Sequence, residues 1–164
     1  MCGITGFQTF KKVNFDSQKK IEIITKILDH RGPDSVGYWH NESKNIYLGH
    51  TRLSIIDLSP HGNQPMQSLD GRYVMVFNGE IYNYRFLKEK LIKKFNIKFR
   101  NETDTTVLLE SISLIGLKKT IQSLEGMFAF ALYDKKQDSI YLVRDRFGEK
   151  PLFYFKDHNQ IYFA

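Results

Sequence analysis

The stretch that most constrains the fold of this 164-residue chain is Met127–Tyr133, where every residue is apolar. Successive side chains of a strand point to opposite faces of a sheet, so an apolar run of this length is typical of a strand buried on both faces. Further strand candidates follow at turn-separated spacing: Ser139–Arg144, Leu152–Phe155 and Ile161–Ala164. The end of the chain is therefore predicted to be nearly all β.

The preceding part of the chain alternates between short β clusters and amphipathic helices. The predicted strands are Ile4–Phe10, Val36–Trp39, Ile46–Gly49, Leu53–Asp57 and Tyr73–Phe77, the last ending at Asn78-Gly79. The predicted helices are one capped by Asp16 or Ser17 with the apolar stripe Ile21, Ile24, Ile27 and Leu28, one at Tyr84–Phe95, one from Thr103 or Asp104 to Gly116, and a short one at Lys118–Ser123. This arrangement indicates an α+β fold with mainly antiparallel sheets.

Composition narrows the class of protein. The hydrophobic fraction of 41% predicts one globular domain. A single cysteine cannot form an internal disulfide, which favours a reducing, cytoplasmic location. No apolar run approaches the ~18–20 residues of a membrane span, so no membrane partner is expected. The net charge of +6 is partly carried by Lys88–Lys98, which we interpret as a solvated helix face; without a recognition motif, no nucleic-acid partner is expected.

The last strand candidate, Ile161–Ala164, runs to the final residue of the chain. Domain boundaries usually fall in exposed loops and not within strands. We therefore expect residues 1–164 to be one domain that is truncated at its C-terminal end and belongs to a longer protein.

Cys2 is the only cysteine and directly follows the initiator Met1. A small second residue usually permits removal of the methionine, which would leave Cys2 with both a thiol and a free α-amine. An N-terminal residue of this kind unites a nucleophile with its own base. The alternative is a chance cysteine buried at the start of a β-strand.

A nucleophile that attacks a carbonyl also needs fixed N–H donors for the oxyanion that forms. Asn78 offers a side-chain amide, and Gly79 offers a backbone N–H that a ligand can approach closely because no Cβ intervenes. The alternative is a type I′ hairpin turn, for which Asn-Gly is a strong signal.

Recognition of a small amino acid needs one cation and one anion. Arg52 suits a carboxylate because its guanidinium forms paired hydrogen bonds. Asp104 suits an ammonium group. The alternatives are a surface arginine for the first and a helix cap for the second. The five histidines lack metal-ligand spacing and no phosphate-binding glycine loop is present, so no metal site and no nucleotide site are predicted within this chain.

Seven motifs occur in one order along the whole chain: Met1-Cys2-Gly3-Ile4, Arg31-Gly32-Pro33-Asp34, His50-Thr51-Arg52-Leu53-Ser54-Ile55, Gln64-Pro65, Asn78-Gly79-Glu80-Ile81-Tyr82-Asn83, Thr103-Asp104-Thr105, and Arg144-Asp145-Arg146-Phe147-Gly148-Glu149-Lys150-Pro151-Leu152. Together they resemble the class II glutamine amidotransferase domain, of the type found at the N-terminus of glutamine-hydrolysing asparagine synthetase. The resemblance implies an N-terminal nucleophile hydrolase fold, in which two mainly antiparallel sheets form a four-layer αββα sandwich.

The resemblance also implies roles for individual residues. The catalytic residues would be Cys2, with its α-amine as base, and Asn78 and Gly79 as the oxyanion hole. The substrate-binding residues would be Arg52 for the α-carboxylate, Glu80 and Asp104 for the α-amine, and Leu53, Ile55 and Ile56 along the pocket.

The implied reaction is hydrolysis of the glutamine side-chain amide through a Cys2 thioester, with release of glutamate and ammonia. The ammonia would serve ATP-dependent asparagine synthesis in a synthetase domain that is absent here and would bring the ATP and Mg²⁺. The implied partners are glutamine and that missing domain. A homodimer is a further possibility that the resemblance leaves open. The alternatives are another ammonia acceptor, or a non-catalytic interaction module on the same fold.

Overall fold

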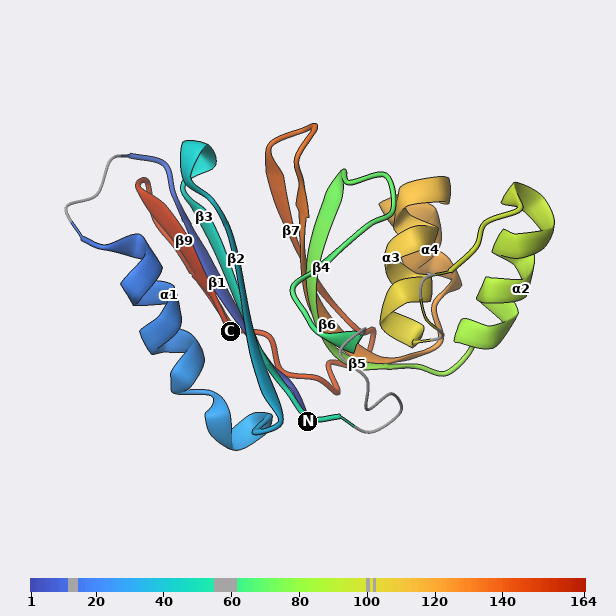
Figure 1. The fold of residues 1–164 in the computed structure, drawn as a ribbon, viewed down its shortest axis with the longest axis horizontal. Helices are drawn as coiled ribbons and strands as arrows, with labels where there is room; N and C mark the ends of the chain where they lie inside the picture. Colours follow the sequence, from blue (N-terminus) through green and yellow to red (C-terminus); the bar gives the residue numbers. More distant parts are fainter. Residues whose placement is uncertain (12–14, 55–61, 100, 102) are drawn as a thin grey trace.

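The computed structural model describes residues 1–11, 15–54, 62–99, 101 and 103–164. Two antiparallel sheets pack face to face, with one helix outside the first sheet and three helices outside the second (Figure 1). The predicted αββα order of layers is therefore confirmed. None of the described helices is long and apolar enough to cross a membrane.

The first sheet, called sheet A here, has five strands. In spatial order they are β2 (Ser35–Asn41), β3 (Ile46–Arg52), β1 (Gly3–Thr9), β9 (Gln160–Phe163) and β8 (Tyr154–Lys156). Helix α1 (Ser17–Lys26) covers its outer face, and two short 3₁₀ helices, η1 (Asp29–Arg31) and η2 (Glu42–Lys44), flank β2. Asp16 caps α1 by accepting a hydrogen bond from the Lys19 N–H at 3.0 Å, as predicted.

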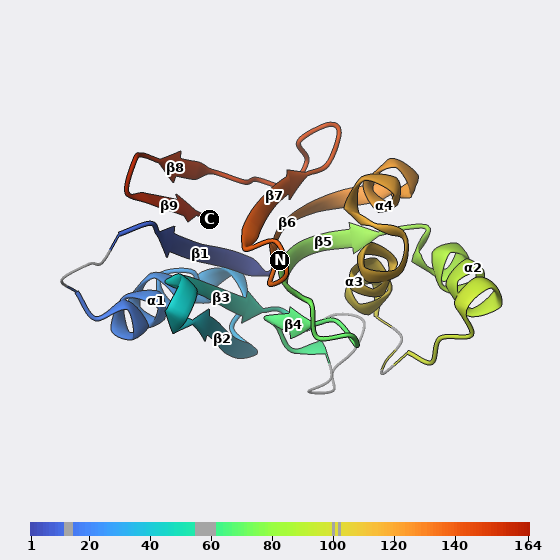
Figure 2. The same cartoon turned by 90° about the horizontal axis from the view of Figure 1, so that it is seen from above.

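The second sheet, called sheet B, has four strands. In spatial order they are β4 (Met66–Gln67), β5 (Tyr73–Ile81), β6 (Gly126–Asp134) and β7 (Ser139–Arg144). The helices on its outer side are α2 (Tyr84–Phe95), α3 (Asp104–Ile115) and α4 (Leu117–Ser123) (Figure 2). The sequence predicted α2 with the same bounds.

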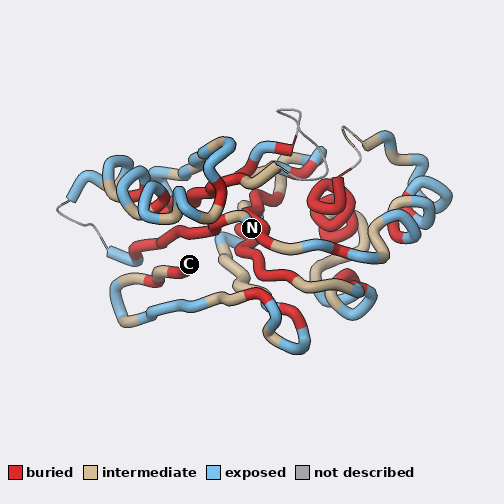
Figure 3. The backbone as a smooth tube through the Cα atoms, turned by 90° about the horizontal axis from the view of Figure 1, so that it is seen from below, coloured by how far each residue is buried: buried red, intermediate tan, exposed pale blue. Residues whose placement is uncertain are grey.

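Strand β6 is buried on both faces, as its apolar run predicted. Phe130 belongs to the hydrophobic cluster that sheet B shares with α2 and α3. Ala131, the next residue, belongs to the cluster between the two sheets. Residues 128–134 of β6 and the whole first half of α3 are buried (Figure 3). Two cores therefore flank sheet B, and its strands are held from both sides.

Three expectations about the elements were wrong. Strand β5 does not end at Asn78-Gly79 but continues to Ile81, because β6 pairs with it along its whole length. Ile27 does not join the buried stripe of α1; it is 67% exposed, and the buried position is Thr25, which packs against Gly49 of β3. Leu53 lies outside any strand, and the rest of that predicted strand, residues 55–57, lies outside the described residues.

Candidate active site

The N-terminus lies where the two sheets meet (Figure 1). A cavity of about 190 Å³ opens there, with walls from sheet A, sheet B and the start of α3. Its lining includes the predicted site residues Cys2, Arg52, Leu53, Asn78, Gly79, Glu80 and Asp104. The other two predicted residues, Ile55 and Ile56, lie outside the described residues.

Cys2 immediately precedes β1 and is held against the end of β3. The N–H of Gly3 donates to Oγ1 of Thr51 at 3.2 Å. The Cys2 Sγ accepts from the Leu53 N–H at 3.5 Å and lies 3.8 Å from the Leu53 carbonyl oxygen, to which it can donate. Cys2 lies just before a strand, as the alternative of a chance cysteine supposed, but it is only half-buried and it lines the cavity. The thiol is therefore both positioned and accessible.

The edge of β5 that faces away from β6 presents backbone groups to the cavity. Strand β4 pairs with β5 only at Val74 and Met75. Farther along, the N–H of Phe77 donates to Oε1 of Gln64 at 2.6 Å and that of Ile81 donates to Oδ2 of Asp104 at 3.0 Å. Alternate N–H groups of a strand point to the same side. The N–H of Gly79, midway between them, therefore points to the same edge, where Gly79 lines the cavity.

Gly79 has no room for a side chain. A Cβ there would lie 2.3 Å from the Met127 carbonyl oxygen and 2.6 Å from the Phe128 Cα. Its neighbour Asn78 is 4% exposed and also lines the cavity. The hairpin alternative is wrong, because both residues lie inside β5 and pair with Phe128 and Ala129 of β6.

Arg52 is the last residue of β3 and is 7% exposed, so the surface-arginine alternative is wrong. Its Nη1 donates to Oδ1 of Asn63 at 2.8 Å. A Cβ on Gly62 would lie 2.2 Å from its Nη2, so a glycine there leaves the space that the guanidinium fills. The side chain is thus held in the cavity wall.

Asp104 is the first residue of α3 and not its cap. The cap is Thr103, whose side chain accepts from the Thr106 N–H at 3.2 Å. Asp104 Oδ1 accepts from the Thr105 N–H at 2.7 Å. Burial is the main cause that raises the pKa of Asp104, and the charge of Glu80 raises it further. Because two carboxyl groups share this side of the cavity, a bound cation would favour the anionic form of Asp104.

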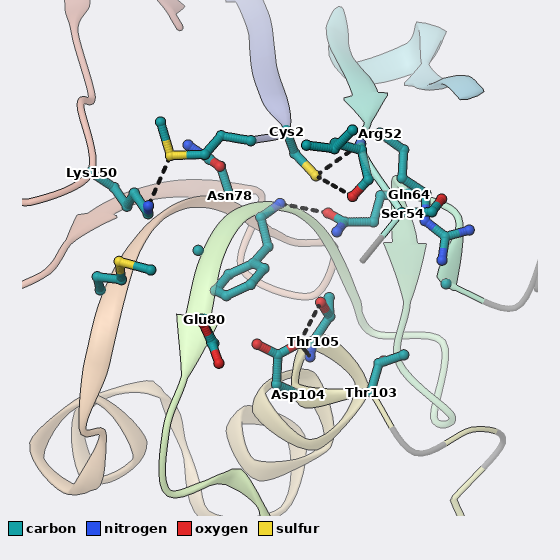
Figure 4. Close-up of a pocket in the computed structure, with 16 residues that line it drawn as sticks. Cys2, Arg52, Ser54, Gln64, Asn78, Glu80, Thr103, Asp104, Thr105 and Lys150 are labelled. Carbon is teal, nitrogen blue, oxygen red and sulfur yellow. Dashed lines mark hydrogen bonds between the residues drawn. The ribbon is translucent and has the colours of Figure 1, made fainter. Parts of the chain in front are cut away.

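Figure 4 shows the resulting arrangement, with Cys2 and Arg52 from the ends of strands of sheet A and Asp104 and Thr105 from the start of α3. A thiol, a guanidinium and two carboxyl groups therefore face one small cavity. This combination suits a zwitterionic amino acid that also carries an electrophilic carbonyl.

The structure also brings residues into or beside the cavity to which the sequence assigned no role, although they lie in the quoted motifs; Gln64, Lys150 and His50 are among them. Gln64 and Lys150 line the cavity, and His50 contacts the carbonyl of Phe77, which also lines it. Lys150 is 6% exposed, and its Nζ donates to Sδ of Met1 at 2.9 Å. The loop that carries Lys150 is organised by Asp145, which accepts from the Lys150 N–H at 3.0 Å. Among the described residues, no cluster of three His, Cys, Asp or Glu side chains could hold a metal ion.

Comparison with known proteins agrees with this geometry. Residues 1–164 match the sequence model of a family described as the glutamine amidotransferase domain. The chain belongs to this family. Asparagine synthetase [glutamine-hydrolyzing] 1 of Bacillus subtilis is 40% identical to it over 168 residues, which cover 100% of this chain and 26% of that protein.

Another relative carries a different name. Amidase chry2 of Gibberella zeae is 38% identical over 173 residues, which cover 100% of this chain and 25% of that protein. The chain thus spans only about a quarter to a third of the length of its curated relatives.

A solved structure confirms the fold. Glutamine phosphoribosylpyrophosphate amidotransferase of B. subtilis, solved with ADP and GMP, matches with a TM-score of 0.74 at 18% identity. The match covers 98% of this chain and 41% of that one. The predicted N-terminal nucleophile hydrolase fold is therefore confirmed.

Proposed function

We propose that this domain hydrolyses the side-chain amide of glutamine through a thioester on Cys2. The observation that carries the proposal is that Cys2, Asn78 and Gly79 line one cavity, into which Asn78 could offer its side-chain amide and Gly79 its N–H. A thiol next to fixed N–H donors is what acyl transfer from an amide requires.

In the proposed mechanism, removal of Met1 frees the α-amine of Cys2 to take the thiol proton. The sulfur then bonds to the amide carbon, and the negative oxygen is stabilised by the Gly79 N–H and the Asn78 amide. The α-ammonium protonates the amide nitrogen, the C–N bond breaks so that ammonia leaves, and a γ-glutamyl thioester remains. Water, deprotonated by the α-amine, attacks the thioester and releases glutamate and the thiol.

The charged residues would hold the part of glutamine that does not react. Arg52 would bind the α-carboxylate, and Asp104 with Glu80 would bind the α-ammonium. Leu53 would line the pocket, since its backbone already contacts the thiol. Ile55 and Ile56 keep the same predicted role.

The ammonia would be used outside this chain. We propose ATP-dependent asparagine synthesis in a synthetase domain of the longer protein, with ATP and Mg²⁺ bound there, because relatives with that name match the whole chain. A different acceptor is the second candidate, because Amidase chry2 matches almost equally well. The amidotransferase cavity itself does not distinguish between the two.

The test measures glutamate and ammonia released from glutamine by protein whose loss of Met1 is confirmed by mass spectrometry. Cys2→Ala and protein that retains Met1 are the controls, and both should be inactive. Full activity with Met1 in place would contradict the α-amine as base. With aspartate, ATP and Mg²⁺ added, this chain should still form only glutamate, whereas asparagine or AMP would show a nucleotide site within it.

A further inference from the structure

Phe77 lies in β5 close to the proposed oxyanion donors. In the part of the chain that the structure describes, side chains from other segments bind both its backbone N–H and its backbone carbonyl. Its N–H donates to Oε1 of Gln64 at 2.6 Å, and its carbonyl lies 3.2 Å from Nε2 of His50. The two groups belong to the edge of β5 that β4 leaves uncovered. Gly79, two residues farther along that edge, carries the proposed oxyanion donor.

His50 links the two sheets at this point. It lies on β3 of sheet A, two residues before Arg52, and is 1% exposed. Burial lowers the pKa of His50 to about 4, so the ring is neutral at physiological pH. Because a carbonyl oxygen can only accept, Nε2 must carry the ring proton and donate it to Phe77.

Gln64 approaches the same residue from the segment that precedes β4. It is 7% exposed and lines the cavity. Its backbone packs directly against β2, because a Cβ on Gly37 of β2 would lie 1.9 Å from the Gln64 carbonyl oxygen. The bond from the Phe77 N–H therefore ties β5 to the segment that lies against β2.

We propose that His50 and Gln64 are positioning residues for glutamine hydrolysis: they hold both polar groups of Phe77 and so aim the Gly79 N–H at the carbonyl that Cys2 attacks. This inference rests on the proposed function. The two hydrogen bonds satisfy the backbone groups of Phe77 as a neighbouring strand would. They leave the same edge of β5 open at Gly79 for the substrate. An oxyanion donor is effective only when it is fixed before the reaction, and a shift of ~1 Å can cost ~100-fold in rate.

The experiment removes each bond while keeping the size of the side chain. Gln64→Met removes the acceptor for the Phe77 N–H, and Gln64→Glu restores an acceptor. His50→Phe removes the donor, and His50→Gln restores an amide Nε2 donor. The matched control is Gln67→Met on β4, which removes a glutamine bond to a backbone carbonyl, that of Gly71 at 3.1 Å, away from the cavity.

Each variant is measured for kcat and KM with glutamine, for thermal unfolding, and for binding of two probes. One probe is glutamate, which needs no oxyanion donor. The other is the aldehyde analogue of glutamine, whose carbonyl adds the Cys2 thiol, so that the sulfur bonds to carbon and the thiol proton passes to the oxygen. This adduct places its oxygen where the oxyanion forms.

We expect Gln64→Met and His50→Phe to lower kcat and aldehyde affinity by roughly 10–100-fold, with KM and glutamate affinity within about twofold of wild type. Gln64→Glu and His50→Gln should recover most of the loss, and Gln67→Met should have no effect. If an apolar variant does not fold, the shorter Gln64→Asn, which withdraws the acceptor, provides the same comparison.

Unchanged kcat in folded variants would overturn the positioning role, as would an equal loss of glutamate and aldehyde affinity, which indicates a general structural defect. Wild-type protein that releases no glutamate would instead overturn the proposed function, and the positioning role with it. The two failures are therefore distinguishable by the wild-type assay alone.

Discussion

The two sheets contribute to the cavity in different ways. Sheet A places side chains at the ends of its strands, with Cys2 just before β1 and Arg52 at the last position of β3. Sheet B places a backbone group from the interior of a strand, the N–H of Gly79 in β5. A side chain at a strand end can be substituted without breaking the hydrogen bonds between strands. A backbone N–H cannot be removed by a substitution and can only be moved by changing the residues around it.

This difference predicts a kinetic division. Arg52, on sheet A, would grip a part of glutamine that stays unchanged during the reaction, so its loss should appear in KM. Asn78 and Gly79, on sheet B, would contact the oxygen whose charge develops in the transition state, so their loss should appear in kcat. The following experiments test this division, beginning with the largest expected effect.

Asn78→Ala should lower kcat by roughly 10²–10³ and change KM little, because one oxyanion donor is lost while the groups that hold the substrate remain. Steady-state kinetics with glutamine measure both constants. The control is Asn159→Ala, an exposed position in the turn between β8 and β9, which should behave as wild type. A loss confined to KM would place Asn78 with the substrate-holding groups instead.

His50 lies on sheet A and contacts the Phe77 carbonyl of sheet B, so its protonation should weaken this contact between the sheets. The pKa of His50 is about 4 in the folded protein and 6.5 in its ordinary state, so between these values the unfolded chain binds the proton more readily. The neutral, buried His50 therefore contributes fully to stability above pH 6.5. As the pH falls from 6.5 towards 4, the free energy of unfolding should decrease by about 3 kcal/mol. Denaturant unfolding at several pH values measures it. His50→Gln should show a correspondingly smaller fall, and identical profiles would contradict the assignment.

Arg52→Ala should raise KM by roughly 10–100-fold with kcat within a few-fold of wild type, because hydrogen bonds to a charged group contribute about 1.5–3 kcal/mol. Arg52→Lys should recover only part, since an ammonium lacks the paired donors of a guanidinium. Steady-state kinetics with glutamine measure kcat and KM for both variants. A large fall in kcat with KM unchanged would mean that Arg52 also acts on the transition state.

Gly62→Ala should have the smallest effect, a rise in KM of roughly fivefold. The added Cβ would lie 2.2 Å from Arg52 Nη2, so the guanidinium must shift, but it is not lost. The kcat should not change. An unaffected KM would show that the position of the Arg52 guanidinium does not matter for binding glutamine.

The sequence by itself determined the parts of the molecule that depend on local pattern. The apolar run Met127–Tyr133 predicted a strand buried on both faces, and helix α2 was predicted with the bounds that the structure has. The order of the motifs indicated the family, whose sequence model matches the whole chain, whereas the role of the lone Cys2 as nucleophile stays a prediction. These inferences hold because side-chain periodicity and motif wording are properties of the chain itself.

The tertiary structure alone decided the features that depend on distant segments. The local sequence Asn78-Gly79 is typical of a turn, but pairing with β6, about 50 positions away, keeps these residues in a strand. Asp104 reads as a helix cap, but its carboxyl binds the Ile81 N–H of β5. His50 and Gln64 showed no role until folding brought both to Phe77. Which backbone groups a ladder leaves open, and which side chains reach them, is set by contacts between segments far apart in sequence, and no local pattern records those contacts.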